Sequence, residues 1–186
     1  MNVKIGVSNR HIHLCQQDFE TLFGNVKIEK LRDLVQTGEF ASNLVVEIAT
    51  EKAKIGKVRF LGPIRKYTQV EISKTDCYTL GIEPPIRTSG NLEGASAITI
   101  IGPCGTITKN CAIVANRHLH INPTDRTRLG LQNIDKISVQ VGNIKSAILN
   151  DVYIKETPNG VLELHLDTDD ANANFLKTGD IAKLLF

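Results

Sequence analysis

The stretch VSNRHIHL at Val7–Leu14 decides how this chain is interpreted, because it returns as VANRHLHI at Val114–Ile121. A second pair of similar segments follows further along each copy, VEISKTD at Val70–Asp76 and LHLDTDD at Leu164–Asp170. Two matched pairs in the same order indicate an internal duplication. In that duplication Glu71 of the first copy takes the place of His165 in the second.

Short alternating segments rich in β-branched residues dominate the rest of the sequence, as in Leu44–Ala49, Ile98–Ile101 and Lys136–Val141. Many short strands bounded by Gly, Pro, Asn or charged residues indicate a barrel or a sandwich. Helical segments are few. They are predicted at Gln16–Phe23, after Ser73, at Pro123–Leu129 and after Asp167, where Ser, Asn and Asp supply cap residues and Pro123 stands at the first helical position.

Composition excludes several classes of function. The chain has 186 residues, 41% of them hydrophobic, which is enough for a real core in one large domain or two small lobes. Its 22 basic and 20 acidic side chains give a net charge of +2 without a clustered basic stripe, so nucleic acid is not an expected partner. No apolar run is long enough for a membrane span, and no secretory signal is visible, so we expect a cytoplasmic protein with no membrane partner.

The four cysteines show no metal-binding or redox spacing. A chain of this size does not need disulfides for stability. We therefore expect reduced thiols, most of them buried, at Cys15, Cys77, Cys104 and Cys111.

The duplicated histidine pairs predict metal binding. Side chains two positions apart on a strand point to the same face, so each His-x-His can present two imidazoles to one ion. Catalytic zinc sites use three protein ligands and leave one position open. The duplication supplies a third ligand to each pair, which gives His11, His13 and Glu71 in one group and His118, His120 and His165 in the other.

A lone His-x-His is more often an ordinary surface or core feature than a ligand set. Here all five histidines of the chain fall in the duplicated positions. Zinc suits such imidazole-rich sets, with two ions expected, although cobalt, nickel or iron fit the same ligands. No cysteine stands beside a histidine pair to close a structural shell, so the open sites favour catalysis.

Arg65 is the candidate for binding an oxyanion. Its planar guanidinium matches phosphate oxygens and never loses its charge. Arg65 and Glu71 are an even number of positions apart, so their side chains point to the same side of an extended segment. Six extended residues would separate them by about 20 Å, so a turn or bulge must bring the arginine back to the site. The alternative interpretation of a single arginine is a solvated surface charge.

These motifs together resemble those of the phosphate propanoyltransferase family, the phosphotransacylases of the propanediol-utilisation type associated with bacterial microcompartments. The resemblance runs from about Ile5 to the C-terminus. It rests on the two N-R-H-x-H segments, on GPIRKYTQVEIS at Gly62–Ser73 and on HLDTDDANA at His165–Ala173.

The resemblance implies a mainly β fold of two pseudo-symmetric β-barrels capped by short α-helices. Residues 1–9 with 118–186 would form the first barrel and residues 10–117 the second, with the metal site between them. It also implies that the six residues of the two groups bind metal and that Arg65 is the catalytic, phosphate-binding residue. Coenzyme A contacts are expected at Val7, Ser8, Asn9, Lys52, Arg59 and Asn172, with Lys54 as an alternative to Lys52.

The implied function is an acyltransferase that interconverts acyl-CoA plus phosphate with acyl phosphate plus CoA, for short acyl chains such as propanoyl or acetyl. The expected mechanism is direct, zinc-assisted attack of phosphate on the thioester. The alternatives are a zinc-dependent hydrolase of a thioester or amide and a non-catalytic, cupin-like metal-binding module. A homo-oligomer and an association with microcompartments stay open, and the lumen of a microcompartment is the alternative location if a targeting extension has been removed.

Overall fold

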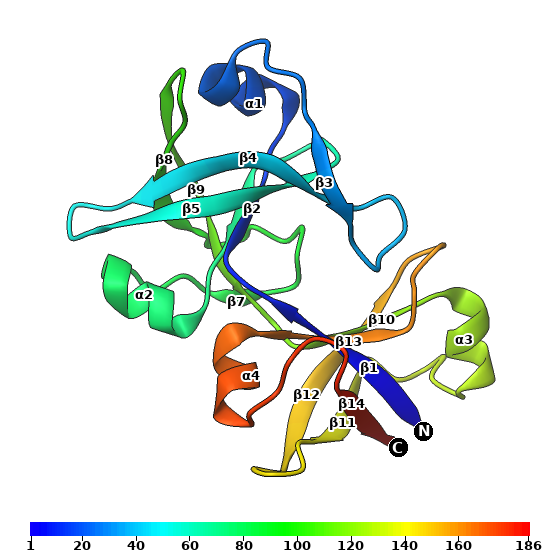
Figure 1. Ribbon diagram of the computed structural model, residues 1–186. Coiled ribbons are helices and arrows are strands. Elements are labelled where there is room, and N and C mark those ends of the chain that lie inside the picture. The colour runs from blue at the N-terminus through cyan, green and yellow to red at the C-terminus, as the bar shows by residue number, and fades with distance from the viewer. The chain divides into compact units, whose positions relative to one another are not determined.

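The computed structural model describes all 186 residues, and the chain separates into two compact units (Figure 1). One unit, called the terminal unit below, contains Met1–Asn9 and Asn116–Phe186. The other, the central unit, contains Arg10–Ala115. Each unit has its own cluster of buried apolar side chains.

The terminal unit is a closed barrel with the strand order β1, β13, β10, β12, β11, β14. Alternate side chains of each strand fill its interior, among them Ile5, Val139 and Leu164, which are fully buried. The strands are β1 (Asn2–Ser8), β10 (His118–Ile121), β11 (Lys136–Val141), β12 (Ala147–Glu156), β13 (Glu163–Asp167) and β14 (Ile181–Leu185).

The central unit also closes on itself, because β8 pairs with both β4 and β9. The order around it is β4, β5, β2, β6, β9, β8, and β3 and β7 extend the sheet at the sides. The strands are β2 (His11–His13), β3 (Lys30–Asp33), β4 (Phe40–Ala49), β5 (Lys54–Gly62), β6 (Gln69–Glu71), β7 (Ile86–Arg87), β8 (Ser96–Ile101) and β9 (Thr106–Ala115).

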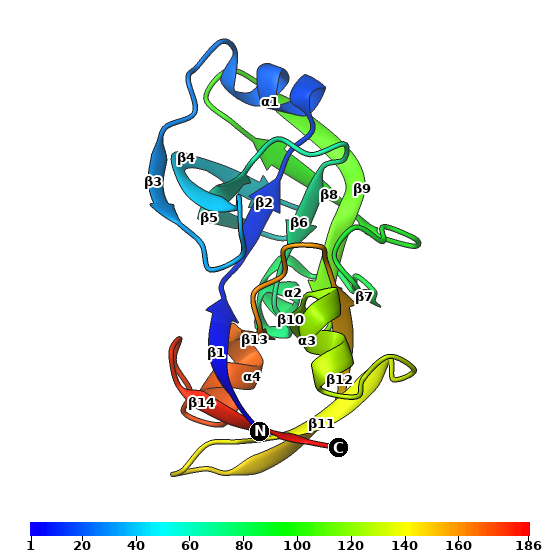
Figure 2. The same ribbon diagram turned by 90° about the vertical axis from the view of Figure 1, so that its right-hand side faces the viewer.

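The two barrels repeat one pattern of strand pairing. The histidine strand, β2 or β10, pairs antiparallel with the strand of the third ligand, β6 or β13, and parallel with β5 or β12. Figure 2 shows β2 and β6 of the central unit, and β13 of the terminal unit beside β1. β1 precedes β2 in the first repeat but pairs within the terminal unit, and β9 precedes β10 in the second repeat but pairs within the central unit. Each barrel therefore contains one strand from the other repeat. The expected mainly β fold of two barrels is confirmed.

All four predicted helical segments form helices, namely α1 (Gln16–Phe23), α2 (Lys74–Leu80), α3 (Pro123–Arg128) and α4 (Thr168–Ala173). Ser73 caps α2 through a capping box with Asp76, and Asp167 caps α4 by accepting the amide of Asp170. No helix is both long enough and apolar enough to span a bilayer.

Gly62, at the end of β5, is needed for packing. It lies opposite Phe40 on β4, and a Cβ at this position would lie 2.2 Å from Phe40 Cζ. The aromatic ring therefore covers the glycine and fixes the point where the chain leaves the barrel toward Arg65. Gly56 on the same strand has open space at its Cβ position.

We expect Gly62→Ala to lower the free energy of unfolding by about 1 to 3 kcal/mol, because the added methyl group overpacks the core against Phe40. Gly56→Ala is the matched control and should change the free energy of unfolding by less than about 0.5 kcal/mol. Denaturant unfolding of both variants, and of Gly62→Ala combined with Phe40→Ala, measures this. A Gly62→Ala effect no larger than the control's would contradict the packing argument, and a double variant that is simply additive would show that Phe40 is not the cause.

Candidate metal centres

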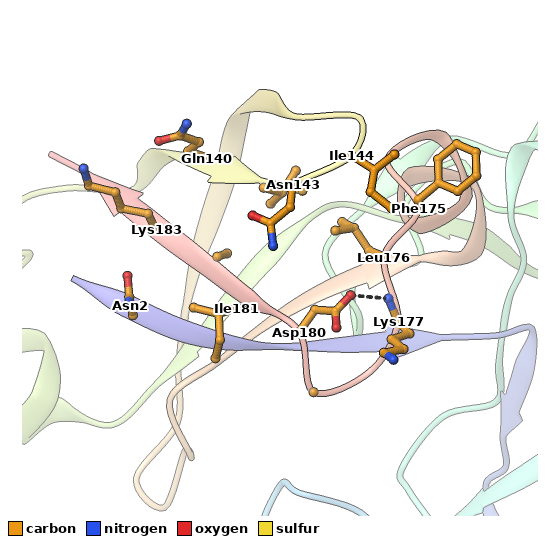
Figure 3. A pocket seen from close by; sticks show the side chains of 14 residues that line it. Asn2, Gln140, Asn143, Ile144, Phe175, Leu176, Lys177, Asp180, Ile181 and Lys183 are labelled. Carbon is orange, nitrogen blue, oxygen red and sulfur yellow. Dashed lines mark hydrogen bonds between the residues drawn. The ribbon is translucent and has the colours of Figure 1, made fainter.

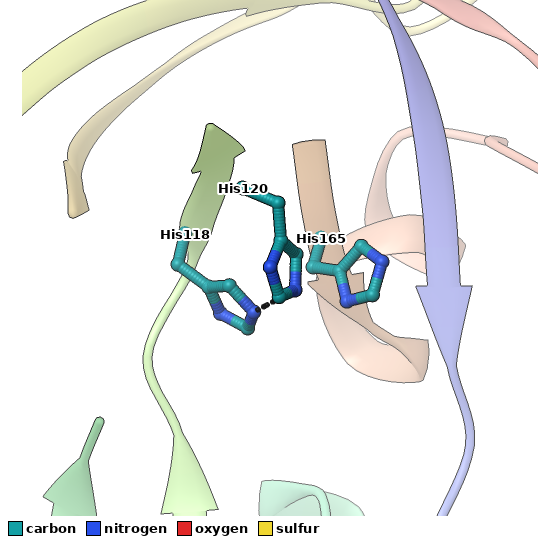
Figure 4. A group of neighbouring side chains, drawn as sticks. All are labelled: His118, His120 and His165. Carbon is teal, nitrogen blue, oxygen red and sulfur yellow. Dashed lines mark hydrogen bonds between the residues drawn. The ribbon is translucent and has the colours of Figure 1, made fainter. Parts of the chain in front are cut away.

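The three-histidine group lies in the terminal unit on two paired strands (Figure 4). His118 and His120 point to one face of β10, and His165 lies directly opposite His118 on β13. Nε2 of His118 is 3.1 Å from Nε2 of His120, and the rings of His120 and His165 have centroids 4.4 Å apart. Both histidines of β10 are only 6% exposed. Three imidazoles therefore converge in a largely dehydrated place.

The donor set fits a transition metal. Two nitrogens bound at about 2.0 Å to one tetrahedral ion lie about 3.3 Å apart, close to the separation of the two Nε2 atoms. Nδ1 of His118 lies 2.9 Å from the carbonyl oxygen of Asn116. A carbonyl only accepts, so Nδ1 carries the proton and leaves the lone pair of Nε2 for an ion.

The second group lies in the central unit and repeats this arrangement with one carboxylate. His11 on β2 is directly opposite Glu71 on β6, and Nε2 of His11 is 3.5 Å from the Glu71 carboxylate. The rings of His11 and His13 have centroids 5.0 Å apart. All three ligand candidates are buried.

His13 is held as a neutral imidazole. Burial lowers its pKa well below the ordinary value, and the neighbouring positive charges of His11 and Arg65 lower the pKa further. Its Nδ1 donates to the carbonyl of Leu61 at 3.0 Å, which leaves the lone pair of Nε2 for an ion. Metal ions bind deprotonated imidazole nitrogens, so the site is prepared for one.

Each histidine strand is tied to the helix that follows the third ligand. Arg10 contacts Asp76 of α2 at 2.8 Å, and Arg117 makes a fork of two bonds, 2.7 and 2.8 Å, to Asp170 of α4. Both arginines immediately precede a histidine pair. No role was predicted for these arginines, although their repetition in N-R-H-x-H is the signal that could have found them.

Arg65 lies beside the group of the central unit rather than on the surface. The chain between β5 and β6 packs against the end of the histidine segment, where the Arg65 amide donates to the carbonyl of Leu14 at 2.8 Å. The guanidinium is held by Glu39 at 2.8 Å and by the hydroxyl of Tyr67 at 3.1 Å, and the side chain is 18% exposed. This path brings the Arg65 backbone next to Leu14, the residue that follows the His11–His13 pair.

A hydrogen-bonded network links Arg65 with the carboxylate of Glu71. The amide nitrogen of Gln69 donates to Glu71 at 2.6 Å and to the Ser89 hydroxyl at 2.9 Å, and Arg65 reaches the same hydroxyl at 3.4 Å. Arg65 and the metal group of the central unit therefore form one polar cluster. Gln69, Ser89 and Glu39 were not predicted, and Ser89 carries no signal in the sequence.

The residues expected to contact CoA are divided between the units. Val7 and Ser8 end β1, Asn9 follows them, and Asn172 is exposed on α4, which packs near β1 in the terminal unit. The Val7 amide donates to the hydroxyl of Thr178 at 3.1 Å.

The two basic residues of this set lie in different parts of the central unit. Arg59 is directly opposite His11 across the β2–β5 pair and donates to the carbonyl of Ser42 at 2.6 Å. Lys52 lies on the turn before β5, where its ammonium group donates to the carbonyl of Tyr78 at 2.7 Å, in the last turn of α2. The alternative, Lys54, pairs with Glu47 at 3.1 Å.

An open pocket of about 730 Å³ lies elsewhere in the terminal unit, between the β11–β12 turn and the segment that leads into β14 (Figure 3). Asn143, Ile144, Phe175 and Lys183 are among the residues that line it. None of the predicted metal, phosphate or CoA residues is among them.

Neither of the two buried cysteines, Cys77 and Cys111, offers an activated nucleophile. Burial raises the pKa of Cys111 to about 12, and the thiol of Cys77 donates to the carbonyl of Ser73 at 3.1 Å. Cys77 and Cys111 are buried, whereas Cys104 is exposed and Cys15 half-buried, so fewer thiols are buried than expected.

The chain is similar to known proteins over almost its whole length. A family profile described as phosphate propanoyltransferase matches residues 4–177. Proteins named phosphate propanoyltransferase from Thermotoga maritima and Salmonella typhimurium are 45% and 43% identical. The alignments cover 97% of this chain and 88% of the first relative, and 92% of this chain and 82% of the second. The chain therefore belongs to the phosphate propanoyltransferase family.

Proposed function

We propose that this chain is a zinc-dependent phosphate acyltransferase that interconverts acyl-CoA and phosphate with acyl phosphate and CoA, for short acyl groups such as propanoyl and acetyl. The observation that carries the proposal is the pair of three-ligand groups, buried except for the half-buried His165, one of which shares a polar cluster with Arg65. Family membership supports the same reaction class. Each group supplies three ligands, which leaves a coordination position for a substrate atom.

A bound zinc ion would supply Lewis acidity toward a carbonyl or phosphate oxygen and toward a departing thiolate. His11, His13 and Glu71 would hold one ion, and His118, His120 and His165 the other. Arg65 binds and orients phosphate through its planar fork. The guanidinium donates to the Glu39 carboxylate at 2.8 Å, so it is already oriented before phosphate binds.

The transfer step is a direct one. An oxygen of phosphate attacks the thioester carbonyl carbon, a carbon–oxygen bond forms, and the carbon–sulfur bond breaks. The electron pair of that bond leaves with the CoA thiolate, which is then protonated from solvent. The high pKa of Cys111 and the burial of Cys77 argue against an acyl intermediate on either of these two thiols.

The CoA contacts proposed for this chain are Val7, Ser8 and Asn9 at the end of β1, Asn172 on α4, and the basic side chains of Arg59 and Lys52. Arg59 is the stronger of the two basic candidates, because it lies opposite the ligand His11. The Lys52 ammonium group must leave the carbonyl of Tyr78 to bind a phosphate of CoA.

Thiol release from propanoyl-CoA and acetyl-CoA, measured with and without phosphate, tests the reaction. We expect release only when phosphate is present, with acyl phosphate as the product. Equal release of free acid without phosphate would instead show a zinc hydrolase, and no turnover of either thioester would favour a non-catalytic metal-binding module.

Removing metal should abolish activity, because the residues of the two groups serve as metal ligands. Without the ion they supply neither a nucleophile nor an acid that could replace it. We expect close to two equivalents of a transition metal in active protein by elemental analysis, loss of turnover after chelation, and recovery with Zn²⁺. Active protein with less than one equivalent of any transition metal contradicts the metal role.

Replacing Arg65 separates phosphate binding from the rest of the site. Arg65→Ala removes a charge-assisted contact worth about 1.5 to 3 kcal/mol, so kcat/KM for phosphate should fall by about one to two powers of ten, with KM for acyl-CoA and metal content little changed. Glu39 is left without the guanidinium, but its side chain is 33% exposed and water can solvate it. Lys at position 65 should rescue only in part, because a point charge cannot reproduce the fork.

The control is Arg32→Ala, which removes an exposed arginine from β3 of the same unit. It should leave the kinetics for phosphate unchanged. If Arg65→Ala keeps wild-type kinetics at sub-saturating phosphate, Arg65 does not bind phosphate and is an ordinary ion-paired side chain.

A further inference from the structure

Each metal group occupies three corners of a four-residue square on its pair of strands. In the central unit His11 faces Glu71 and His13 faces Gln69. In the terminal unit His118 faces His165 and His120 faces Glu163. Residues two apart on a strand and directly opposite on its partner share one face, so the fourth corners, Gln69 and Glu163, point toward the ligands.

Glu163 contacts the third ligand directly. Its carboxylate lies 2.5 Å from Nε2 of His165, and the residue is 4% exposed. Figure 4 shows one ring nitrogen of His165 facing the other two imidazoles while the second points away from them. Since Nε2 is bonded to the carboxylate, Nδ1 is the nitrogen available to an ion.

Gln69 makes the corresponding contact in the central unit with the opposite hydrogen-bonding sense. The backbone amide of Gly90 donates to its side-chain oxygen at 2.7 Å, which turns the amide nitrogen toward Glu71 at 2.6 Å. A carboxylate ligand therefore has a donor beside it, and an imidazole ligand has an acceptor beside it. The fourth corner is chemically matched to the third ligand in both repeats.

Gly6 makes room for the pair in the terminal unit. It lies beside His165 in the β1–β13 register, and a Cβ there would stand 2.9 Å from both the Glu163 carboxylate and the His165 ring. Ile113 is the residue beside Glu71 in the β6–β9 register of the central unit. The glycine is thus found where a glutamate and an imidazole must fit side by side.

We propose that Glu163 is the positioning residue of His165. Its carboxylate accepts the Nε2 proton, fixes the tautomer and the ring orientation, and directs the Nδ1 lone pair toward the site of His118 and His120. This inference rests on the proposed metal role of the three histidines. Carboxylate partners of metal-binding histidines raise the basicity of the ligand, and their loss lowers metal affinity by about ten- to a hundredfold.

Zinc and cobalt binding to the full chain tests the proposal through Glu163→Gln and Glu163→Ala. Zinc affinity is measured by competition with a chromophoric chelator, and site geometry by the visible absorption of Co²⁺. We expect Glu163→Ala to weaken one of two zinc equivalents by about ten- to a hundredfold and to change the cobalt spectrum. Glu163→Gln keeps an acceptor oxygen and should weaken that equivalent less.

The control is Glu156→Gln, which removes one carboxylate charge from the same unit, where it pairs with Arg126 at 3.3 Å. It should leave both zinc affinities and the cobalt spectrum unchanged. If Glu163→Ala does not fold, Glu163→Gln decides alone, and it must still weaken one equivalent measurably.

Wild-type zinc affinities and cobalt spectra in folded Glu163 variants would overturn the positioning role while leaving the metal sites in place. Loss of one whole equivalent, as in His165→Ala, would also overturn it, because that is the behaviour of a direct ligand. Failure of the unmodified protein to bind zinc would remove the metal role and this inference with it.

Discussion

The antiparallel register between the histidine strand and the strand of the third ligand is the constraint on which both candidate centres depend. His11 must face Glu71, and His118 must face His165, for the three ligand atoms of each group to meet. A slip of one residue would move every side chain of one strand to the opposite face and abolish the group. The two arginine–aspartate pairs resist such a slip, because they join the residue before each histidine pair to the helix that follows the third ligand.

The two repeats share this strand register, but the residue types at the matching positions differ. Glu71 stands where His165 stands in the other repeat, and the neighbouring Gln69 and Glu163 differ in a compensating way. A donor beside a carboxylate and an acceptor beside an imidazole both satisfy a buried polar side chain, whereas a glutamate beside Glu71 would place two acceptors together. The two centres therefore offer different charge and ligand sets within one architecture.

Much of the site could be predicted because the information was repeated in the sequence. The six ligand candidates and the four helices follow from residue types that recur at matching positions and from cap residues such as Ser73 and Asn122. Periodicity carries no record of strand partners, so the exchange of β1 and β9 between the barrels was expected only from the resemblance. The short strands β3 and β7 carry no pattern strong enough to predict them.

The surroundings of Arg65 depend on tertiary contacts that no local pattern contains. Its approach to the ligands is set by the path of the chain past Leu14, and its partners Glu39 and Ser89 come from separate loops. Lys52 has a residue type that suits a CoA phosphate, but a tertiary contact gives it another partner. Its ammonium group donates to the carbonyl of Tyr78 at the end of a helix.

The most direct test of two separate metal centres is anomalous X-ray diffraction at the zinc absorption edge, from crystals of protein purified without added metal. We expect two anomalous peaks, one among His11, His13 and Glu71 and one among His118, His120 and His165. Crystals of active protein with no anomalous peak at either group, or with metal bound only elsewhere, would contradict the presence of two metal centres.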